Sequence, residues 1–267
     1  MKMKTLLSLI AGSCFLATAN TMALTIDFSG GYAPGDLLGQ PGTGTQWIRT
    51  NAPAAPNIIE VAAGVGAGGT QGIRSVSTGA GSNFVFYGFN TTNADLGFAF
   101  DSGASVLEYS FQWRPTQALD ASDSPDIFRF SIGSSTNIGD SAAVRLTVRA
   151  NGAFLAQNGG SALVQHALFQ ADVYSTISGT IDYGSKTYTV FVDGTQLFDG
   201  TNGGDLAFEN AAADNVFIRL GNLSAANPDY RAWSMDNISI IPEPATYAAF
   251  FGLLAIGIVL LNRRRRA

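Results

Sequence analysis

A two-residue alternation of apolar and polar side chains runs through the second half of the chain and restricts its fold more than any other feature. It is clearest over residues 106–114, where the apolar positions are Leu107, Tyr109, Phe111 and Trp113. Residues 128–132 and 144–149 repeat the pattern. Because successive side chains of a β-strand point to opposite faces, each segment has one apolar face. The pattern predicts antiparallel strands that cover a core on one side and meet solvent on the other.

Short turn sequences separate the predicted strands. Asn151-Gly152 and Asp193-Gly194 are typical of tight hairpin turns, and residues 183–186 join two further segments. The remaining strands are expected at 24–28, 83–89, 175–182, 187–192, 196–198, 215–220 and 233–241. Residues 30–56 are rich in Gly and Pro and predict a loop, whereas 62–82 predict a loop with one strand. We therefore expect an all-β fold, a single antiparallel β-sandwich over residues 24–241.

The predicted sandwich is acidic and contains no cysteine. Cys14 is the only cysteine of the chain, so neither a disulfide nor thiol chemistry is expected in residues 24–241. These 218 residues are enough for one hydrophobic core. Nine basic residues against nineteen acidic ones give the segment a net charge near −10, whereas the whole chain has −5. Such a body repels nucleic acid and anionic lipid, so we expect no nucleic-acid partner.

The first 23 residues have the pattern of a secretory signal peptide. Lys2 and Lys4 precede an apolar stretch over 6–16, and small residues follow. Cleavage is expected after Ala19 or Ala23, and the sequence leaves both open. The segment predicts a signal helix, export through the secretion translocon and removal by signal peptidase. A lipoprotein anchored at Cys14 is disfavoured, because no large aliphatic residue stands three positions before the cysteine.

The C-terminal segment, residues 242–267, has three parts in a fixed order. It opens with Pro242, Glu243 and Pro244, and an uncharged apolar run of seventeen residues follows over 245–261. It closes with a basic cluster made of Arg263, Arg264, Arg265 and Arg266. A helix over the apolar run would cover roughly 26 Å, just short of a hydrocarbon core of about 30 Å. We expect a transmembrane helix with the arginines on the cytoplasmic side and the body outside.

This order of tripeptide, span and arginine cluster resembles the PEP-CTERM sorting signal of exported bacterial proteins. Tails of that family are processed by exosortase, a membrane-embedded cysteine transpeptidase, in bacteria that make extracellular polysaccharide. The resemblance implies that Pro242, Glu243 and Pro244 are recognition residues and that exosortase is a partner. It also implies a final place at the cell surface or in the extracellular matrix, linked to exopolysaccharide and biofilm. A plain C-terminal anchor, with the prolines as helix breakers, is the alternative.

The predicted sandwich also resembles a known family. The hairpin that ends at residues 188–194, together with the late strand that ends at 236–240, resembles the concanavalin A-like jelly roll. Lectins, laminin-G-type domains and some glucanases have that fold. The resemblance covers roughly residues 100–241. It implies a jelly-roll sandwich, and an activity that must be argued from a site and not from the fold.

The sequence lacks the motifs that glycan hydrolysis would require. Glucanases of this fold carry paired carboxylates on one strand, in a Glu-x-Asp pattern followed by a second Glu. Glu60, Glu108 and Glu209 stand alone, and none has an Asp two positions later. His166 is the only histidine and is expected in a loop, which disfavours zinc sites and a Ser-His-Asp arrangement. We expect a non-catalytic protein, and a glycan-active hydrolase is the alternative.

Acidic loop residues are the candidates for a calcium site. Those that could supply ligands are Asp120, Asp123, Asp126, Asp199 and Asp205, and the resemblance to the jelly roll adds Asp236 in the last predicted strand. Calcium takes six to eight oxygen ligands, which carboxylates and loop carbonyls can provide. None of the spacings matches an EF-hand, so solvated acids are the favoured interpretation and no cofactor is required.

Exposed aromatic rings are the candidates for glycan binding, because sugars pack against aromatic faces beside polar groups. Trp47, in the Gly-rich loop, and Tyr230 are the two candidates that we retain. Trp113 shares the apolar face of its strand and is predicted in the core. Taken together, the sequence predicts a non-catalytic exported protein that is sorted by its tail and that binds extracellular polysaccharide.

Overall fold

The computed structural model describes residues 24–40, 47–49, 57–77, 85–89, 100–117, 119, 125–133, 142–166, 169–198, 204–223 and 233–243. All of them belong to one compact unit. The predicted signal peptide and the tail from Pro244 onward lie outside these residues, and so do both predicted terminal helices. Within the described part of the chain, no helix is long and apolar enough to cross a membrane.

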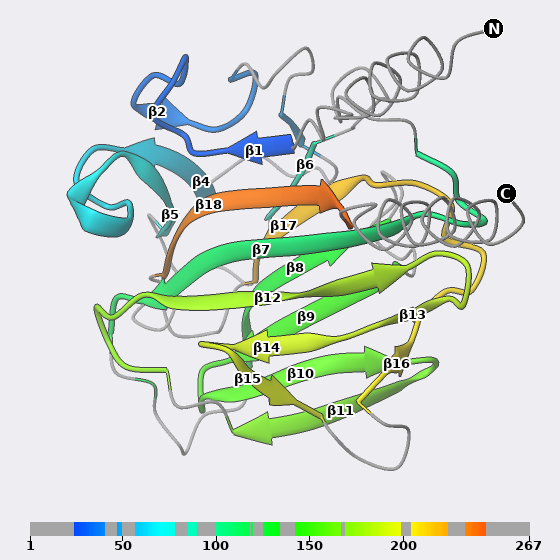
Figure 1. The fold of residues 1–267 in the computed structure, drawn as a ribbon. Coiled ribbons are helices and arrows are strands. Elements are labelled where there is room, and N and C mark those ends of the chain that lie inside the picture. The colour runs from blue at the N-terminus through cyan, green and yellow to red at the C-terminus, as the bar shows by residue number, and fades with distance from the viewer. Residues whose placement is uncertain are drawn as a thin grey trace, which may run out of the picture. The chain divides into compact units, whose positions relative to one another are not determined.

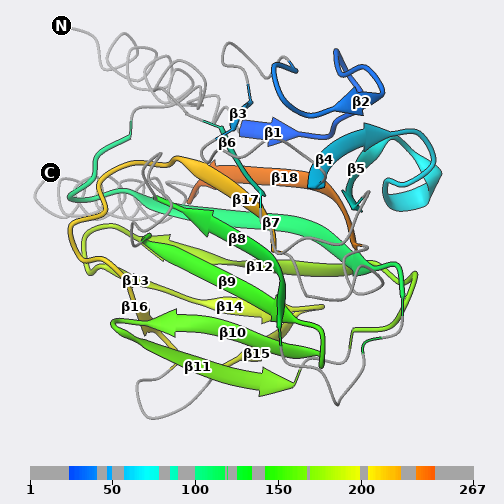
Figure 2. The ribbon, with the colours of Figure 1, turned by 180° about the vertical axis from the view of Figure 1, so that it is seen from behind.

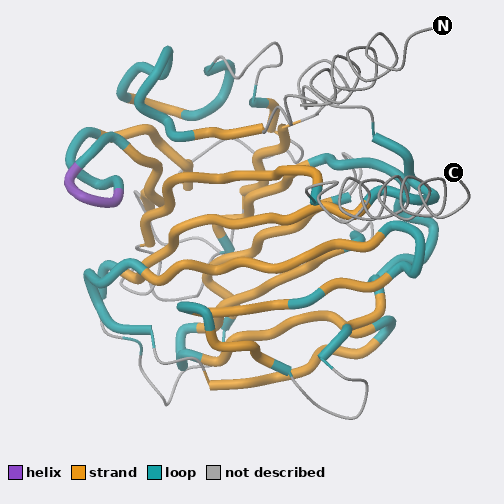
Figure 3. Tube along the Cα trace, in the orientation of Figure 1, coloured by secondary structure: helices purple, strands orange, loops and turns teal. Residues whose placement is uncertain are grey.

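The described residues form two antiparallel β-sheets that lie face to face (Figures 1 and 2), which confirms the antiparallel sandwich. The only helical element among them is the short 3-10 segment η1 (Ala67–Gly69), which Figure 3 shows in purple. The larger sheet has eleven strands and the smaller one seven.

The larger sheet follows one main path with three short strands beside it. The path is β15 (Thr195–Leu197), β14 (Val190–Val192), β12 (Ser175–Asp182), β7 (Val106–Pro115), β18 (Trp233–Pro242), β5 (Gly72–Ser77), β4 (Asn57–Ala62) and β2 (Gly35–Asp36). The additional strands are β1 (Leu24–Ile26) on β18, β13 (Thr187–Tyr188) on β12, and β16 (Leu206–Ala207) on β13. The centre of the sheet is therefore the long pair β7 and β18, with β12 on the other side of β7.

The smaller sheet has a simple linear order. It runs β11 (Ser161–His166), β10 (Ala153–Asn158), β9 (Val144–Arg149), β8 (Asp126–Ile132), β17 (Ile218–Asn222), β6 (Val85–Phe89) and β3 (Ile48–Arg49). The predicted Asn151-Gly152 turn joins β9 to β10, and Gly152 adopts the positive φ of 80° that such a turn favours. His166 is the last residue of β11, so the prediction that it belongs to a loop is wrong.

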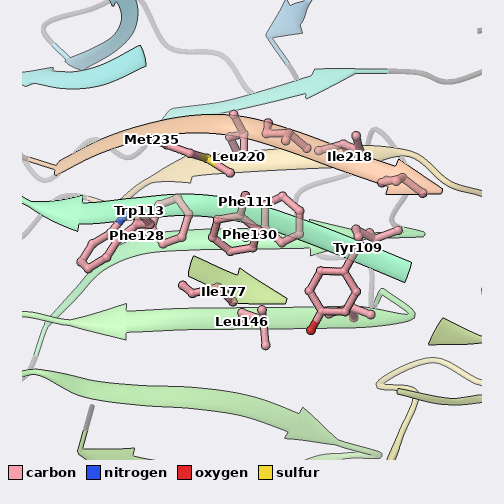
Figure 4. Packing of buried hydrophobic residues seen from close by; sticks show 14 of the residues in the cluster. Tyr109, Phe111, Trp113, Phe128, Phe130, Leu146, Ile177, Ile218, Leu220 and Met235 are labelled. Carbon is pink, nitrogen blue, oxygen red and sulfur yellow. The ribbon is translucent and has the colours of Figure 1, made fainter. Parts of the chain in front are cut away.

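Aromatic rings from both sheets make the centre of the core (Figure 4). The ring centroid of Phe111 on β7 lies 4.2 Å from that of Phe130 on β8. Trp113 lies 5.5 Å from Phe128 and has no exposed surface, which confirms its predicted place in the core. Burying an aromatic side chain contributes about 1.5–3 kcal/mol, so this double layer of rings fixes how the sheets face each other.

The strand β18 is irregular at one point and longer than predicted at its end. Its pairing with β7 shifts between Asp236 and Ser239, where Asn237 adopts a positive φ of 52°. At its end, Pro242 pairs with Leu107, and the backbone N–H of Glu243 donates to the carbonyl of Val106 at 2.9 Å. The strand thus extends beyond the predicted domain boundary at residue 241, into the first residues of the proposed sorting tripeptide.

Candidate functional site

The outer face of the larger sheet, which points away from the core, carries a polar strip at its centre. On β7, buried core residues alternate with half-buried ones, and β12 has the same alternation. Side chains at alternate strand positions point to opposite faces, so Glu108 and Ser110 on β7 point outward, as do Ser178 and Thr180 on β12. The same alternation that places apolar side chains in the core therefore places these polar side chains on the outer face.

A hollow of about 250 Å³ opens on this strip. It is lined by Glu108, Tyr109, Ser110, Ser178, Gly179, Thr180, Phe191, Ser239 and Ile241. The residues come from four neighbouring strands of the larger sheet. Its volume lies just below the range of roughly 300–1,000 Å³ that is typical of small-molecule pockets, so a compact ligand group would fit it.

Three serines stand side by side across the floor of the hollow. Ser110 on β7 pairs with Ser178 on β12 and with Ser239 on β18. Neighbouring strands lie about 4.8 Å apart, so these three residues, which we call the serine row, extend over about 10 Å. Phe191 on β14 pairs with Ser178 and continues the row as an apolar edge.

A second row runs parallel to the first, two residues along the strands. Glu108 pairs with Thr180 on one side and with Ile241 on the other. Two residues of a strand span about 7 Å, which separates the rows by about that distance. The hollow thus presents one carboxylate and several hydroxyl groups between two apolar side chains.

The polar groups of the hollow are largely unpaired. Among the residues that the structure describes, the side chains of Glu108, Ser110, Ser178 and Ser239 make no hydrogen bond or ion pair. Each of them is half-buried. Half-buried polar groups on a rigid sheet that lack protein partners are well placed to bind a ligand that carries its own hydrogen-bonding groups.

Gly179 allows the backbone of Thr189 to lie very close to β12 beside the hollow. A Cβ atom at this position would lie 2.0 Å from the carbonyl oxygen of Thr189 and 2.8 Å from the ring of Tyr109. That carbonyl accepts a hydrogen bond from the Tyr109 hydroxyl at 2.9 Å. The backbone N–H of Thr180 donates instead to Oγ1 of Thr189, also at 2.9 Å. Burial raises the pKa of Tyr109 well above its ordinary value, so its hydroxyl keeps its proton.

Asp236 lies on the same outer face but is covered by the segment around η1. Its Oδ2 accepts hydrogen bonds from the backbone N–H of Ala67 at 3.0 Å and from the Thr70 hydroxyl at 3.2 Å. Its Oδ1 accepts the backbone N–H of Asn237 at 2.8 Å. Desolvation by burial is the larger effect and raises the pKa of the Asp236 carboxyl, although these hydrogen bonds act to lower it.

Of the other calcium candidates, the two that the structure describes are not brought together with Asp236. Asp205 is exposed, and Asp126 pairs with Arg149 at 3.1 Å and with Arg129 at 3.4 Å. Asp120, Asp123 and Asp199 lie outside the described residues. Within the described ranges, no three His, Cys, Asp or Glu side chains gather in a group that could hold a metal ion.

Trp47 is a core residue, so the proposal that it offers an exposed ring to a glycan is wrong. It has no exposed surface, and its ring lies 5.2 Å from that of Phe89. Its indole N–H donates to the Tyr32 hydroxyl at 3.1 Å, which satisfies the one polar group of the side chain. The second aromatic candidate, Tyr230, lies outside the described residues, as do Pro244 and Arg263, Arg264, Arg265 and Arg266.

Sequence reasoning missed the serine row as a site. Ser110 and Glu108 were placed correctly on the face opposite the core, but Ser178 and Ser239 are far away in the chain. Only the register of β12 and β18 against β7 makes them neighbours. The available signal was the run of small polar residues at outward positions of the predicted strands.

Comparison with known proteins gives a likeness in fold. No protein-family model matches the chain, and neither does any curated protein. The receptor binding domain of botulinum neurotoxin D superposes with a TM-score of 0.52 at 11% identity, over 84% of this chain and 50% of that one. A sialidase superposes with a TM-score of 0.51 at 12% identity, over 82% of this chain and 18% of that one.

The chain thus spans half of the toxin domain and less than a fifth of the sialidase. At such identities the likeness supports the β-sandwich fold and nothing finer.

Proposed function

We propose that this chain is a non-catalytic exported protein that binds glycan in the hollow on the outer face of its larger sheet. The observation that carries the proposal is the serine row beside Glu108, with unpaired oxygens next to the ring of Phe191. Saccharides offer hydroxyl groups to such oxygens and apolar C–H faces to such a ring. The fold that we propose in finer terms is the concanavalin A-like jelly roll.

Binding is better supported than hydrolysis, because the lining contains a single carboxylate. Most glycosidases use two carboxyl groups, about 5–9.5 Å apart. Asp182 stands diagonally across from Glu108 on the same face, but it does not line the hollow. Its Oδ1 accepts the backbone N–H groups of Gly184 at 2.7 Å and Ser185 at 3.0 Å. These hydrogen bonds lower the pKa of Asp182 in spite of its partial desolvation, which suits a turn acceptor better than a general acid.

Export and sorting complete the proposal. A signal peptide over residues 1–23 leads the protein out, and the tail over 242–267 holds it at the membrane until exosortase processes it. The body then reaches the cell surface or the polysaccharide matrix. Support comes from the sequence alone, in the order of the Pro242–Pro244 tripeptide, the apolar run and the arginine cluster.

Blocking the hollow tests the binding half of the proposal. In Ser178→Trp, a large side chain enters the hollow from β12, whereas in Thr176→Trp the same side chain stands on the same face but outside the lining. The purified full-length protein is tested against an immobilised panel of neutral and charged oligosaccharides. We expect binding to weaken at least tenfold in Ser178→Trp and to be retained in Thr176→Trp. Equal binding by the two variants, with unchanged melting temperatures, would show that the hollow is not the glycan-binding site.

Intact mass tests the sorting half. The protein is expressed in a host with an active exosortase and in the same host without it. We expect loss of the tail only where exosortase is active, and no loss when Pro242, Glu243 and Pro244 are all replaced by Ala. A product that keeps both ends in both hosts contradicts export and sorting together.

A further inference from the structure

We infer that the hollow prefers a cationic amino sugar, one whose ring carries a free protonated amine, over neutral and acidic sugars. The inference rests on the proposed glycan binding and names the ligand class of that same hollow. It starts from Glu108, the one carboxylate among the lining residues. Glu108 is half-buried between Thr180 and Ile241, where water screens its charge less than at an open surface.

No described cation neutralises Glu108. Arg114, on the same face of β7, stands six residues away, which is roughly 20 Å along a strand. Its guanidinium lies 4.8 Å from the centre of the Tyr174 ring and donates to the carbonyl of Asp172 at 3.2 Å. Lys186 donates to the carbonyl of Ser102 at 2.8 Å. The described cations nearest in the chain to the lining strands β7 and β12 are therefore engaged elsewhere.

The remaining lining groups can bind the rest of such a sugar. The serine row offers hydroxyls that both donate and accept hydrogen bonds, so it suits the hydroxyl groups of a sugar ring. Phe191 offers an apolar surface at the edge. A carboxylate–ammonium hydrogen bond is roughly twice as strong as one between neutral groups. A uronic or sialic acid would bring its own carboxylate against Glu108, inside a body with nineteen acidic and nine basic residues.

Matched oligosaccharides test the preference. The probes are a glucosamine oligomer, the N-acetylglucosamine oligomer of the same length and a galacturonic acid oligomer, measured by calorimetry at pH 6 and low salt with the full-length protein. We expect the glucosamine oligomer to bind about tenfold more tightly than its acetylated counterpart, and the acidic oligomer to bind most weakly. In Glu108→Gln the advantage of the free amine should disappear, so that the glucosamine oligomer and its acetylated counterpart bind with equal affinity.

Asp205→Asn is the control, because it removes the same charge from an exposed residue outside the hollow and should leave the preference intact. A preference that survives in Glu108→Gln, or an equal affinity for both oligomers in the wild type, overturns the inference. If the acetylated oligomer binds and Ser178→Trp blocks it, the proposed function stands although the amine preference has failed. If no oligomer binds, both fail.

Discussion

At the scale of single residues, Glu108 and Asp236 are two carboxylates of the outer face with opposite surroundings. Glu108 has no side-chain partner among the described residues, whereas Asp236 accepts hydrogen bonds on Oδ2 from Ala67 and Thr70 and on Oδ1 from Asn237. Burial nevertheless raises the pKa of Asp236. A carboxyl whose pKa is raised by folding binds its proton more tightly in the folded state, so it favours the fold more at low pH than at neutral pH.

Asp236→Asn should therefore change how stability depends on pH. The stabilisation from protonating Asp236 is present at low pH and is lost as the pH rises from about 4 through the raised pKa of the folded state. Asn cannot titrate, so the free energy of unfolding of the variant should fall less over that range. Urea unfolding at pH 4, 5, 6 and 7 measures this. Parallel pH profiles for the two proteins would show that the carboxyl is not desolvated.

Trp47 should matter for stability and not for binding. Trp47→Ala removes a fully buried ring and should cost about 3–5 kcal/mol of unfolding free energy. Trp47→Phe keeps most of the packing and loses the hydrogen bond to Tyr32, which should cost about 1 kcal/mol beyond any difference in packing. Glycan affinity of folded Trp47→Phe should equal that of the wild type. A large loss of glycan affinity in Trp47→Phe would indicate that Trp47 takes part in glycan binding.

The contrast between two tryptophans shows what the sequence could predict. The regular alternation of its strand predicts Trp113 in the core, and the structure confirms this. Trp47 stands in a Gly-rich segment without periodicity, and it is buried by Phe28 and Phe89 from other parts of the chain. Local pattern fixes the face of a residue within a strand, but it cannot tell which distant side chains will cover a residue in a loop.

At the scale of elements, β12 depends on Gly179. Gly179→Ala would place a methyl group 2.0 Å from the backbone oxygen of Thr189, which cannot move away as a flexible side chain could. We expect a loss of about 1–3 kcal/mol and weaker glycan binding, because the same strand carries Ser178. Gly160→Ala is the matched control, since no heavy atom lies within 4 Å of its new methyl group. Chemical denaturation compares the two, and equal effects would refute the role of Gly179.

The end of β18 should be part of the fold. A chain that stops after Glu243 keeps the Pro242–Leu107 pair and the hydrogen bond from Glu243 to Val106, whereas a chain that stops after Ile241 loses both. The shorter chain should be less stable by about 0.5–1.5 kcal/mol. Melting temperatures measure the difference. Equal values would mean that this strand end contributes nothing and is free for a processing enzyme.

Most strands could be predicted from the sequence, but the site could not. β7, β9 and β12 lie within two residues of the predicted segments, because their alternation is regular. The predicted segments omit β2, β3, β4, β11 and β16, and of these β2, β3 and β16 have only two residues each and therefore no period. The hollow depends on the register of β12 and β18 against β7, and nothing in a single sequence specifies which serines will be neighbours.

At the scale of the whole molecule, the sandwich is stabilised by its core without covalent cross-links. Residues 24–241 contain no cysteine, and two layers of buried aromatic and aliphatic side chains face each other between the sheets. A reducing agent should therefore leave the melting temperature of the protein without residues 1–23 unchanged. A clear drop on reduction would mean that Cys14 is still present and takes part in a disulfide.

A crystal structure of the protein with a bound oligosaccharide would test glycan binding in the hollow most directly. We expect one sugar ring over the serine row, with its hydroxyl groups within hydrogen-bond distance of Ser110 and Ser178 and its apolar face toward Phe191. A sugar bound at the loops at either end of the sandwich, or on the smaller sheet, with the hollow left unoccupied, would contradict it.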